Sequence, residues 1–594
     1  MAESRELELS AAQRGMVLGH LLDASGHAYN IGQYQAIEGP LDVDRFVEAA
    51  RYVVAHTEAV RTRIVVTESG YTQRIEANES YRLPVIDLSG SVDPEAEAQT
   101  LQRRLVSTPF DLSVGPLFRG ALVRVAEERW QNVCIVHHAV FDGLSGLLWP
   151  QRMAHVYTAL STGEPLPVYA AGEVATLLAQ ESAYRASSQQ ERDRQYWLQR
   201  LDGCEPSPAW SGRLLGKSRN VVRQSLMLPA ALTAQLRVQA RRLETTVGQL
   251  VTAASALLQC LHGRSNSCVL GLPVLGRRGR AARLIPGMTS NVAHLRLDCG
   301  PQLTVMELVA AVGRQFDAAL RHQRYDSVQL RRDLGLKPED PDLYSLSVNL
   351  MPFDHALRFA DSPSQNHNLA NGPEQGLGLM VYDEPGQPEL RLDLNGNTDL
   401  YTAEDLARYL VQLQQVLEQL SGAPADAPLA WLDLVGPAQS GRLAAFNATD
   451  HALDSSLLLP DLFAAQVIKT PDAVALVFED TTLTYAELDA RSSQLARYLI
   501  SLGAGPEGRV AIGLERSVEL IVAILAVLKS GAAYVPLDPE YPVERLSYML
   551  TDSSALLLLT TLDLAERLAT GALAAGAQQV LLDDPAVLGA LEAL

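Results

Sequence analysis

The stretch VCIVHHAVFDG, residues 133–143, joins an apolar run to two adjacent histidines and an Asp-Gly turn. The apolar residues predict a buried strand, and the polar residues gather where that strand ends. Because successive side chains of a strand face opposite sides, only one of His137 and His138 can point into a given cleft. The sequence therefore places a candidate site at this strand end and leaves open which histidine faces it.

The residue types at this strand end suit acyl transfer. An imidazole can accept a proton from an attacking amine or hold that amine in line. Asp142 can fix the imidazole tautomer or brace the turn, and Gly143 can take a positive φ or offer its N–H to an oxyanion. The alternatives are a purely structural histidine pair and a metal site. No metal is predicted, since the two side chains diverge and no third ligand has recognisable spacing.

Length and charge limit the classes of protein. At roughly 100–200 residues per domain, 594 residues predict three to five units. The 49 basic and 69 acidic residues give a formal net charge of −20, which disfavours a nucleic-acid partner. The densest basic run, around Arg277, is short and contains no aromatic residue.

The cysteines and the apolar runs indicate a cytoplasmic protein. Five cysteines, never in a CxxC pattern, suggest neither a disulfide framework nor a zinc site. The N-terminus lacks the apolar core of a signal peptide, and the longest apolar run, residues 520–528, is too short for a membrane span.

Strand-like and helix-like segments alternate along the whole chain, which predicts a mixed α/β fold. Helices are expected at residues 12–22, 43–56, 324–335 and 404–420, and a strand at 29–39. Trp149-Pro150 predicts an interruption or a bend in the helix that follows the histidine motif.

The clearest linker by composition is SGAPADAPLA, residues 421–430. After it, from about residue 456, short strands alternate with amphipathic helices as in a nucleotide-binding α/β domain. No glycine-rich Ser/Thr phosphate loop occurs in this last part, so ATP-dependent activation by this chain alone is not expected.

HHAVFDG resembles the HHxxxDG signature of condensation domains of nonribosomal peptide synthetases, in the chloramphenicol-acetyltransferase-like superfamily. Further stretches resemble the other motifs of that family in the family's order: LSAAQR (9–14), HTEAVRT (56–62), YW (196–197), GLPVLGR (271–277), GMTSNV (287–292) and HQ (322–323). The stretches RHQRYDSVQL, SVNLMPFD and HNLANGP are most similar to the subgroup that includes the condensation domain of the serine-activating enterobactin synthase component.

Residues 456–594 resemble the beginning of an adenylation domain. LTYAELDARSSQLARYL is similar to its first core motif and LKSGAAYVPLDPEYPVERLSYMLTDS to its second. The phosphate-binding and later motifs of that family are missing, so no adenylation activity is expected of this chain.

The resemblance implies two chloramphenicol-acetyltransferase-like lobes forming a V-shaped condensation domain, followed by a partial α/β adenylation subdomain. We accordingly expect an N-lobe at residues 1–178, a C-lobe at 179–430, a linker at 431–455 and the truncated adenylation part at 456–594.

The resemblance also implies roles for individual residues. His138 is expected to face the active-site tunnel with Gly143 beside the reacting thioester. Asp142 is expected to pair with Arg277, and His137 to pack structurally. The remaining expected tunnel residues are Ser290, Asn291 and Asn349.

The family's activity is amide-bond formation between a donor thioester and the amine of an aminoacyl thioester. No intrinsic cofactor is expected; the substrates are thioesters of carrier-bound phosphopantetheine or of CoA. Because the chain begins about eight residues before the first motif, the donor is expected in trans, from acyl-CoA as in starter condensation domains or from a separate carrier. The expected partners are carrier proteins on the donor and acceptor sides of a monomer. The alternatives are a non-catalytic module that docks carriers, and an epimerising or ester-forming member of the superfamily.

Overall fold

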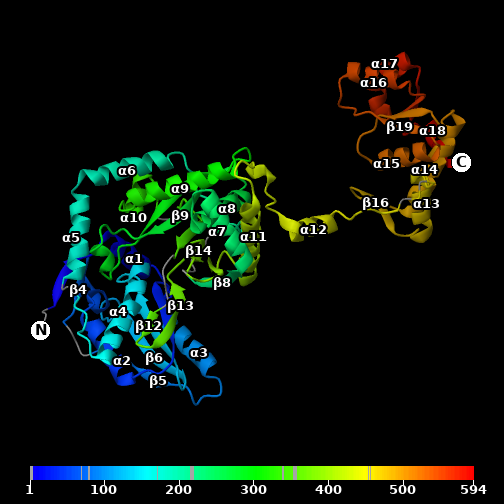
Figure 1. The fold of residues 1–594 in the computed structure, drawn as a ribbon. Coiled ribbons are helices and arrows are strands. Elements are labelled where there is room, and N and C mark those ends of the chain that lie inside the picture. Colours follow the sequence, from blue (N-terminus) through cyan, green and yellow to red (C-terminus); the bar gives the residue numbers. More distant parts are fainter. Residues whose placement is uncertain are drawn as a thin grey trace. The chain divides into compact units, whose positions relative to one another are not determined.

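The computed structural model describes residues 4–68, 70–77, 81–169, 172–213, 220–337, 340–351, 357–384, 386–452, 454 and 456–594. The chain divides into two compact units, Met1–Ala445 and Phe446–Leu594, each considered by itself (Figure 1). Residues 352–354, the end of the stretch SVNLMPFD, lie outside the described residues. No helix of the described part is long and apolar enough to cross a membrane.

The first unit contains two six-stranded sheets. One has the order β12-β13-β2-β7-β6-β5 and is antiparallel except for the β5–β6 pair. Its strands are β2 (Asn30–Glu38), β5 (Val85–Asp87), β6 (Phe118–Ala126), β7 (Arg129–His137), β12 (Leu357–Phe359) and β13 (Ser362–Asn371). The helices of this half are α1 (Ala11–Leu21), α2 (Val43–Ala55), α3 (Pro94–Ser107) and α4 (Gly143–Thr162). A small sheet is made of β1 (Arg5–Glu8), β3 (Thr62–Thr67) and β4 (Gly70–Ile75), with the short helix η1 (Glu58–Arg61) before β3.

The second sheet has the order β10-β9-β11-β14-β15-β8, with β9, β11 and β14 parallel to one another. Its strands are β8 (Val221–Leu228), β9 (Ser267–Val274), β10 (Asn291–Asp298), β11 (Leu346–Leu350), β14 (Leu377–Tyr382) and β15 (Leu390–Asn397). The helices here are α5 (Glu173–Arg185), α6 (Ser188–Leu201), α7 (Ala230–Arg242), α8 (Val247–Gly263), α9 (Val305–Arg321), α10 (Ser327–Asp333) and α11 (Ala403–Gly422), with the short helices η2 (Ala282–Leu284) and η3 (Leu429–Trp431). A core of apolar side chains from both strands and helices fills this half.

One segment of the later chain joins the sheet of the first half. Strands β12 and β13 come from the later part of the chain but belong to the first sheet, where β13 pairs with β2 and β12 with β13. A single cut at residue 178 therefore does not separate the two sheets, because residues 357–371 belong with the first one. This crossing brings residues that follow β13 close to the end of β7, as the site below shows.

The helices expected from sequence are confirmed at α1, α2, α10 and α11, and the expected strand at β2, each within a few residues. Helix α11 begins with a capping box, in which Thr402 and Asp405 satisfy each other's backbone N–H groups.

The prediction that the stretch SGAPADAPLA is a linker is wrong, because this stretch packs into the first unit. Within it, Ala427 accepts a backbone hydrogen bond from Val305 at 3.0 Å, and Leu429 donates one to Leu303 at 2.7 Å. Ala427 and Leu429 are buried in the core of the second half. The stretch contains the end of α11, a turn and the start of η3, and Pro428 pairs with Thr304 at the start of α9. Helix α12 (Gly436–Phe446) comes after η3.

The second unit is a four-stranded parallel sheet of order β19-β18-β20-β21 with helices, next to a two-stranded hairpin. Its strands are β16 (Val474–Phe478), β17 (Thr481–Thr484), β18 (Arg509–Ile512), β19 (Ala533–Pro536), β20 (Leu557–Thr560) and β21 (Gln578–Leu581). Its helices are α13 (Leu459–Lys469), α14 (Tyr485–Ser501), α15 (Val518–Lys529), α16 (Val543–Ser553), α17 (Leu562–Ala575) and α18 (Pro585–Glu592). Apolar strand residues such as Val510 and Leu557 are fully buried beneath these helices, as parallel sheets require.

Candidate active site

The two adjacent histidines point in different directions, as their strand position requires. His137 is the last residue of β7 and is completely buried, whereas His138 is partly exposed and lines a cavity of about 780 Å³. The structure thus answers what the sequence left open: His138 is the histidine that faces the cavity.

One ring nitrogen of His138 is fixed by the backbone. Its Nδ1 lies 2.6 Å from the carbonyl oxygen of Phe141. Because a carbonyl oxygen can only accept, Nδ1 carries the proton and Nε2 keeps a free lone pair. Burial lowers the pKa of His138, although the Phe141 carbonyl and the Asp142 charge oppose this effect. The imidazole is therefore held neutral, with an acceptor nitrogen available to a ligand.

His137 has a structural environment. Its Nδ1 accepts a hydrogen bond from the Ala139 N–H at 3.1 Å, so its proton lies on Nε2, 3.2 Å from Nδ1 of His20 on α1. Burial lowers its pKa to about 3, with small contributions from the neighbouring histidines. This side chain joins β7 to α1. Among the described residues, it is not one of those that line the cavity.

Asp142 and Arg277 form a buried ion pair across the two halves of the unit. Their carboxylate and guanidinium groups lie 2.7 Å apart, and both side chains are almost completely buried. Asp142 also accepts hydrogen bonds from the backbone N–H and hydroxyl of Ser145 at 2.9 and 2.7 Å, which caps α4. Arg277 donates further to Thr289, Ile285 and Gly287.

Of the two roles that the sequence left open for Asp142, the geometry favours the brace. The tautomer of His138 is fixed by the Phe141 carbonyl, which the sequence reasoning missed because a backbone acceptor has no signature in the sequence. A second buried pair, Arg152 on α4 and Glu173 on α5, is 2.6 Å long, and Arg152 also donates to the Leu284 carbonyl. The two pairs hold α4 against the second half.

Gly143 differs from one expectation. It is the first residue of α4 and is not among the residues of positive φ, because the helix starts there with ordinary helical geometry. A Cβ built on it would meet no atom within 4 Å, so its exposed face borders open space. Its N–H belongs to the first turn of the helix, where backbone donors have no partner within the helix and the helix dipole is positive.

Of the two outcomes expected at Pro150, an interruption or a bend, the interruption does not occur, because α4 runs from Gly143 to Thr162. A proline lacks the N–H that would bond the carbonyl four residues earlier, here that of Gly146. Nε2 of Gln33 donates to this carbonyl at 2.6 Å instead, so the missing bond is replaced from β2.

The cavity contains the other expected tunnel residues, Ser290, Asn291 and Asn349. Asn291 already uses its side chain, since its amide donates to the Gln323 and Tyr325 carbonyls and accepts from the Ser327 N–H. A second cavity of about 610 Å³ shares Ser290, Asn291 and Arg277 with the first. The two cavities therefore meet beside the Asp142–Arg277 pair.

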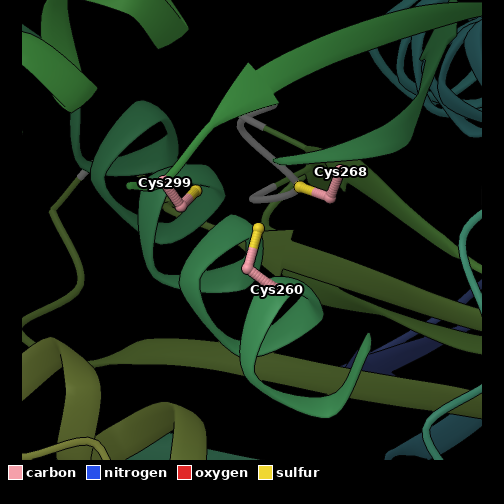
Figure 2. Close-up of side chains that lie close together, drawn as sticks. All are labelled: Cys260, Cys268 and Cys299. Atoms are coloured by element: carbon pink, nitrogen blue, oxygen red, sulfur yellow. The ribbon is translucent and has the colours of Figure 1, made fainter. Parts of the chain in front are cut away.

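Three of the five cysteines come together away from this site, which the sequence spacing did not suggest. The sulfur atoms of Cys260 on α8, Cys268 on β9 and Cys299 after β10 lie within 4.8 Å of one another and point toward a common centre (Figure 2). All three are buried free thiols. No fourth histidine, cysteine or carboxylate among the described residues joins them, and structural zinc takes four ligands.

Comparisons with known proteins agree with this architecture. Residues 3–443 match the model of the condensation domain family, and residues 463–592 match that of AMP-binding enzymes. The chain is 34% identical to the dimodular nonribosomal peptide synthase of Bacillus subtilis over 96% of its own length and 24% of the relative. It is 30% identical to enterobactin synthase component F of Escherichia coli, over 94% of this chain and 43% of that one. The chain thus spans less than half the length of these curated relatives.

Solved structures of single domains give a closer match in length. The starter condensation domain of rhizomide synthetase, determined in complex with C8-CoA, is 34% identical with a TM-score of 0.67 over 72% of this chain and 97% of that one. The first condensation domain of the CDA synthetase is 30% identical, with a TM-score of 0.67 over 72% and 98%. The chain belongs to the condensation domain family of nonribosomal peptide synthetases, a family of acyltransferase-type enzymes, and continues into part of an AMP-binding domain.

Proposed function

We propose that this chain joins a donor acyl or aminoacyl thioester to the amine of an aminoacyl thioester on a carrier protein, in nonribosomal peptide biosynthesis. The observation that carries the proposal is the orientation of His138 at a cavity. Its Nδ1 is bound to the Phe141 carbonyl, and its Nε2 has no hydrogen-bond partner among the residues that the structure describes. Such a nitrogen can accept a proton from an amine or hold it in line for attack.

The remaining residues of the site take complementary roles in this reaction. The N–H of Gly143 at the start of α4 can stabilise the oxyanion that forms when the amine attacks the thioester carbonyl. Asp142, Arg277 and His137 keep β7, α4 and the second half in register rather than contact the substrate. Ser290 and Asn349 border the path of the substrates, while Asn291 holds the loop before α10.

The chemistry needs no intrinsic cofactor. A thioester is already activated, and an α-amino group with a pKa of about 8 loses its proton readily. The main task is therefore to bring amine and carbonyl together, which alone can supply much of the rate enhancement. Two cavities that share Arg277, Ser290 and Asn291 suit two phosphopantetheine arms that enter from different sides.

The donor in this proposal arrives in trans, as an acyl-CoA or on a separate acyl carrier. The solved relative that was determined with C8-CoA supports an acyl-CoA donor. Apolar side chains that line the cavity, including Ile31, Val136, Leu147 and Met351, provide a wall for an acyl chain. We further propose a monomer in the cytoplasm, where its five free thiols would stay reduced.

The experiment offers octanoyl-CoA and an octanoyl carrier protein in turn to the chain and an aminoacyl carrier protein, and follows the acceptor by intact mass. We expect an added octanoyl mass on the acceptor with at least one donor. Carrier binding without product from either donor would contradict the proposal and favour a docking module. An acceptor amino acid of inverted configuration, detected by chiral chromatography after its release, without added mass would favour an epimerising enzyme.

A further inference from the structure

The cavity beside His138 holds one carboxylate that the mechanism does not use. Three acidic residues line this cavity: Asp142, Asp326 and Glu374. Asp142 is paired with Arg277, and Asp326 accepts the Gln329 N–H at 2.8 Å as the cap of α10. The carboxylate of Glu374 has no hydrogen-bond or ion-pair partner within the described part of the chain.

The fold makes space for this carboxylate. Glu374 lies between β13 and β14, and its backbone carbonyl accepts a hydrogen bond from the Asn397 side chain at 3.0 Å. Its side chain lies over Gly378 of β14, where a Cβ would be only 2.1 Å from Oε1 of Glu374. Any larger residue at position 378 would push the carboxylate away, so glycine leaves room for it.

The charge of Arg223 acts on the Glu374 carboxylate without contact. Arg223 favours the charged form of Glu374 only through space, since its guanidinium donates to Asn395 Oδ1 at 2.7 Å and to the Asn368 carbonyl at 3.1 Å. Burial consequently raises the pKa of Glu374 to about 7. A carboxylate without a partner in such surroundings is costly, and a cationic ligand would remove that cost.

The loop between β13 and β14, which carries Glu374, also lies next to His138, the proposed catalytic histidine. A Cβ built on Gly372 would lie 3.0 Å from Cδ2 of His138, and Glu374 follows two residues later. Two residues of extended chain span about 7 Å. His138 and Glu374 line the same cavity, so a substrate that binds beside His138 can have an ammonium group near Glu374.

We propose that Glu374 binds an ammonium group of the acceptor aminoacyl substrate and so determines which acceptors the cavity holds well. This inference rests on the proposed function. An anionic group would be repelled by this carboxylate, and a metal ion would need further ligands that do not gather around it among the described residues.

Two ammonium groups are available on an acceptor. The α-ammonium is common to every aminoacyl thioester and must lose its proton before it attacks. A side-chain ammonium, as in lysine or ornithine, stays charged throughout the reaction. Lysyl and norleucyl thioesters distinguish the α-ammonium from the side-chain ammonium. Their side chains have similar length, and only the lysine side chain carries a positive charge.

The test compares the wild-type chain with E374Q, using lysyl and norleucyl groups on the same carrier protein and octanoyl-CoA at saturation. We expect E374Q to raise the acceptor KM about tenfold or more, the scale of one charged hydrogen bond, with little change in kcat. An increase for both acceptors identifies the α-ammonium, and an increase for lysyl alone identifies the side chain. An unchanged KM for both acceptors would overturn the inference.

Two further variants keep this test specific. G378A, which crowds the carboxylate, should raise the acceptor KM in the same direction. E389Q removes an exposed carboxylate of the same unit and should leave the KM unchanged.

Binding of the unreactive amide analogue of lysyl-pantetheine, measured by calorimetry, tests Glu374 even if no turnover occurs. Weaker binding to E374Q supports the inference, and equal binding contradicts it. Absence of product from the wild-type chain would count against the proposed function alone.

Discussion

The two compact units of this chain bury different kinds of side chain. In Met1–Ala445, charged residues lie inside the protein, among them the pairs Asp142–Arg277 and Arg152–Glu173, and the cavities of about 780 and 610 Å³ lie beside the first pair. In Phe446–Leu594, the buried polar residues of the described part are neutral: Ser492, Ser530 and Thr560.

The two units differ in what their buried side chains contribute to stability and to the positions of neighbouring groups. A parallel sheet buried on both faces is stabilised by apolar packing and needs no internal charge. A buried ion pair contributes little net stability, but it fixes the position of the groups it joins. In the first unit those groups are the start of α4 and the loop after β9, which border the cavity that His138 lines.

The largest expected effect is on the stability of the first unit. D142N should lower its free energy of unfolding by about 3–5 kcal/mol, because the buried Arg277 charge loses its counterion. Calorimetry of the full chain should show a lower melting temperature for the first unit and an unchanged transition for the second. The exposed D44N is the matched control. A D142N melting curve identical to wild type would show that the pair does not hold the halves together.

A substitution in the core of the second unit tests whether condensation activity depends on that unit. L499A removes a fully buried side chain from α14 and should destabilise the second unit by about 2–5 kcal/mol through the cavity it leaves. Amide formation at a temperature where both units are folded should stay at the wild-type rate. A parallel loss of condensation activity would mean that catalysis depends on the second unit.

A small substitution at the helix start should affect catalysis without affecting stability. In G143A the added methyl group meets no protein atom within 4 Å, so the melting temperature should stay within a degree or two. The rate of amide formation should fall about tenfold, because the methyl group takes space beside the reacting carbonyl and its oxyanion donor. Equal rates for G143A and wild type would remove Gly143 from the site.

The smallest expected effect is a pH dependence that only the first unit shows. The pKa of His137 is about 3 in the folded protein, well below that of a histidine in an unfolded chain. The unfolded state therefore binds more protons between these values, and stability falls as pH drops below about 6.5.

Urea unfolding at pH 7 and pH 5.5 measures this effect. The loss attributable to His137 is at most about 1.4 kcal/mol per pH unit, and H137Q should remove it. The second unit contains one histidine, the exposed His451, and should show no comparable loss. An equal loss in H137Q and wild type would assign the effect to other groups.

Much of the site was predictable because it is local in sequence. The polar end of β7 and the divergence of its two histidines follow from strand geometry alone. The choice of His138 over His137 required the family resemblance, and the structure agrees through the cavity and the Phe141 contact.

What could not be predicted depends on contacts between distant segments. Gln33 replaces the hydrogen bond that Pro150 cannot make, so a residue that usually breaks helices leaves α4 intact. The packed Ser421–Ala430 stretch has the composition of a linker, since composition does not record that Val305 and Leu303 bind it. Strand β13 crosses to the first sheet, and nothing in its own sequence indicates which sheet it joins.

The measurement closest to the central claim compares wild type with H138A in the octanoyl transfer assay, followed by intact mass of the acceptor carrier. We predict a rate at least about 100-fold lower for H138A, with unchanged melting temperatures of both units. H155A, an exposed histidine of α4, should retain the wild-type rate. Amide formation by H138A at the wild-type rate would contradict the assignment of this histidine and of the cavity it faces.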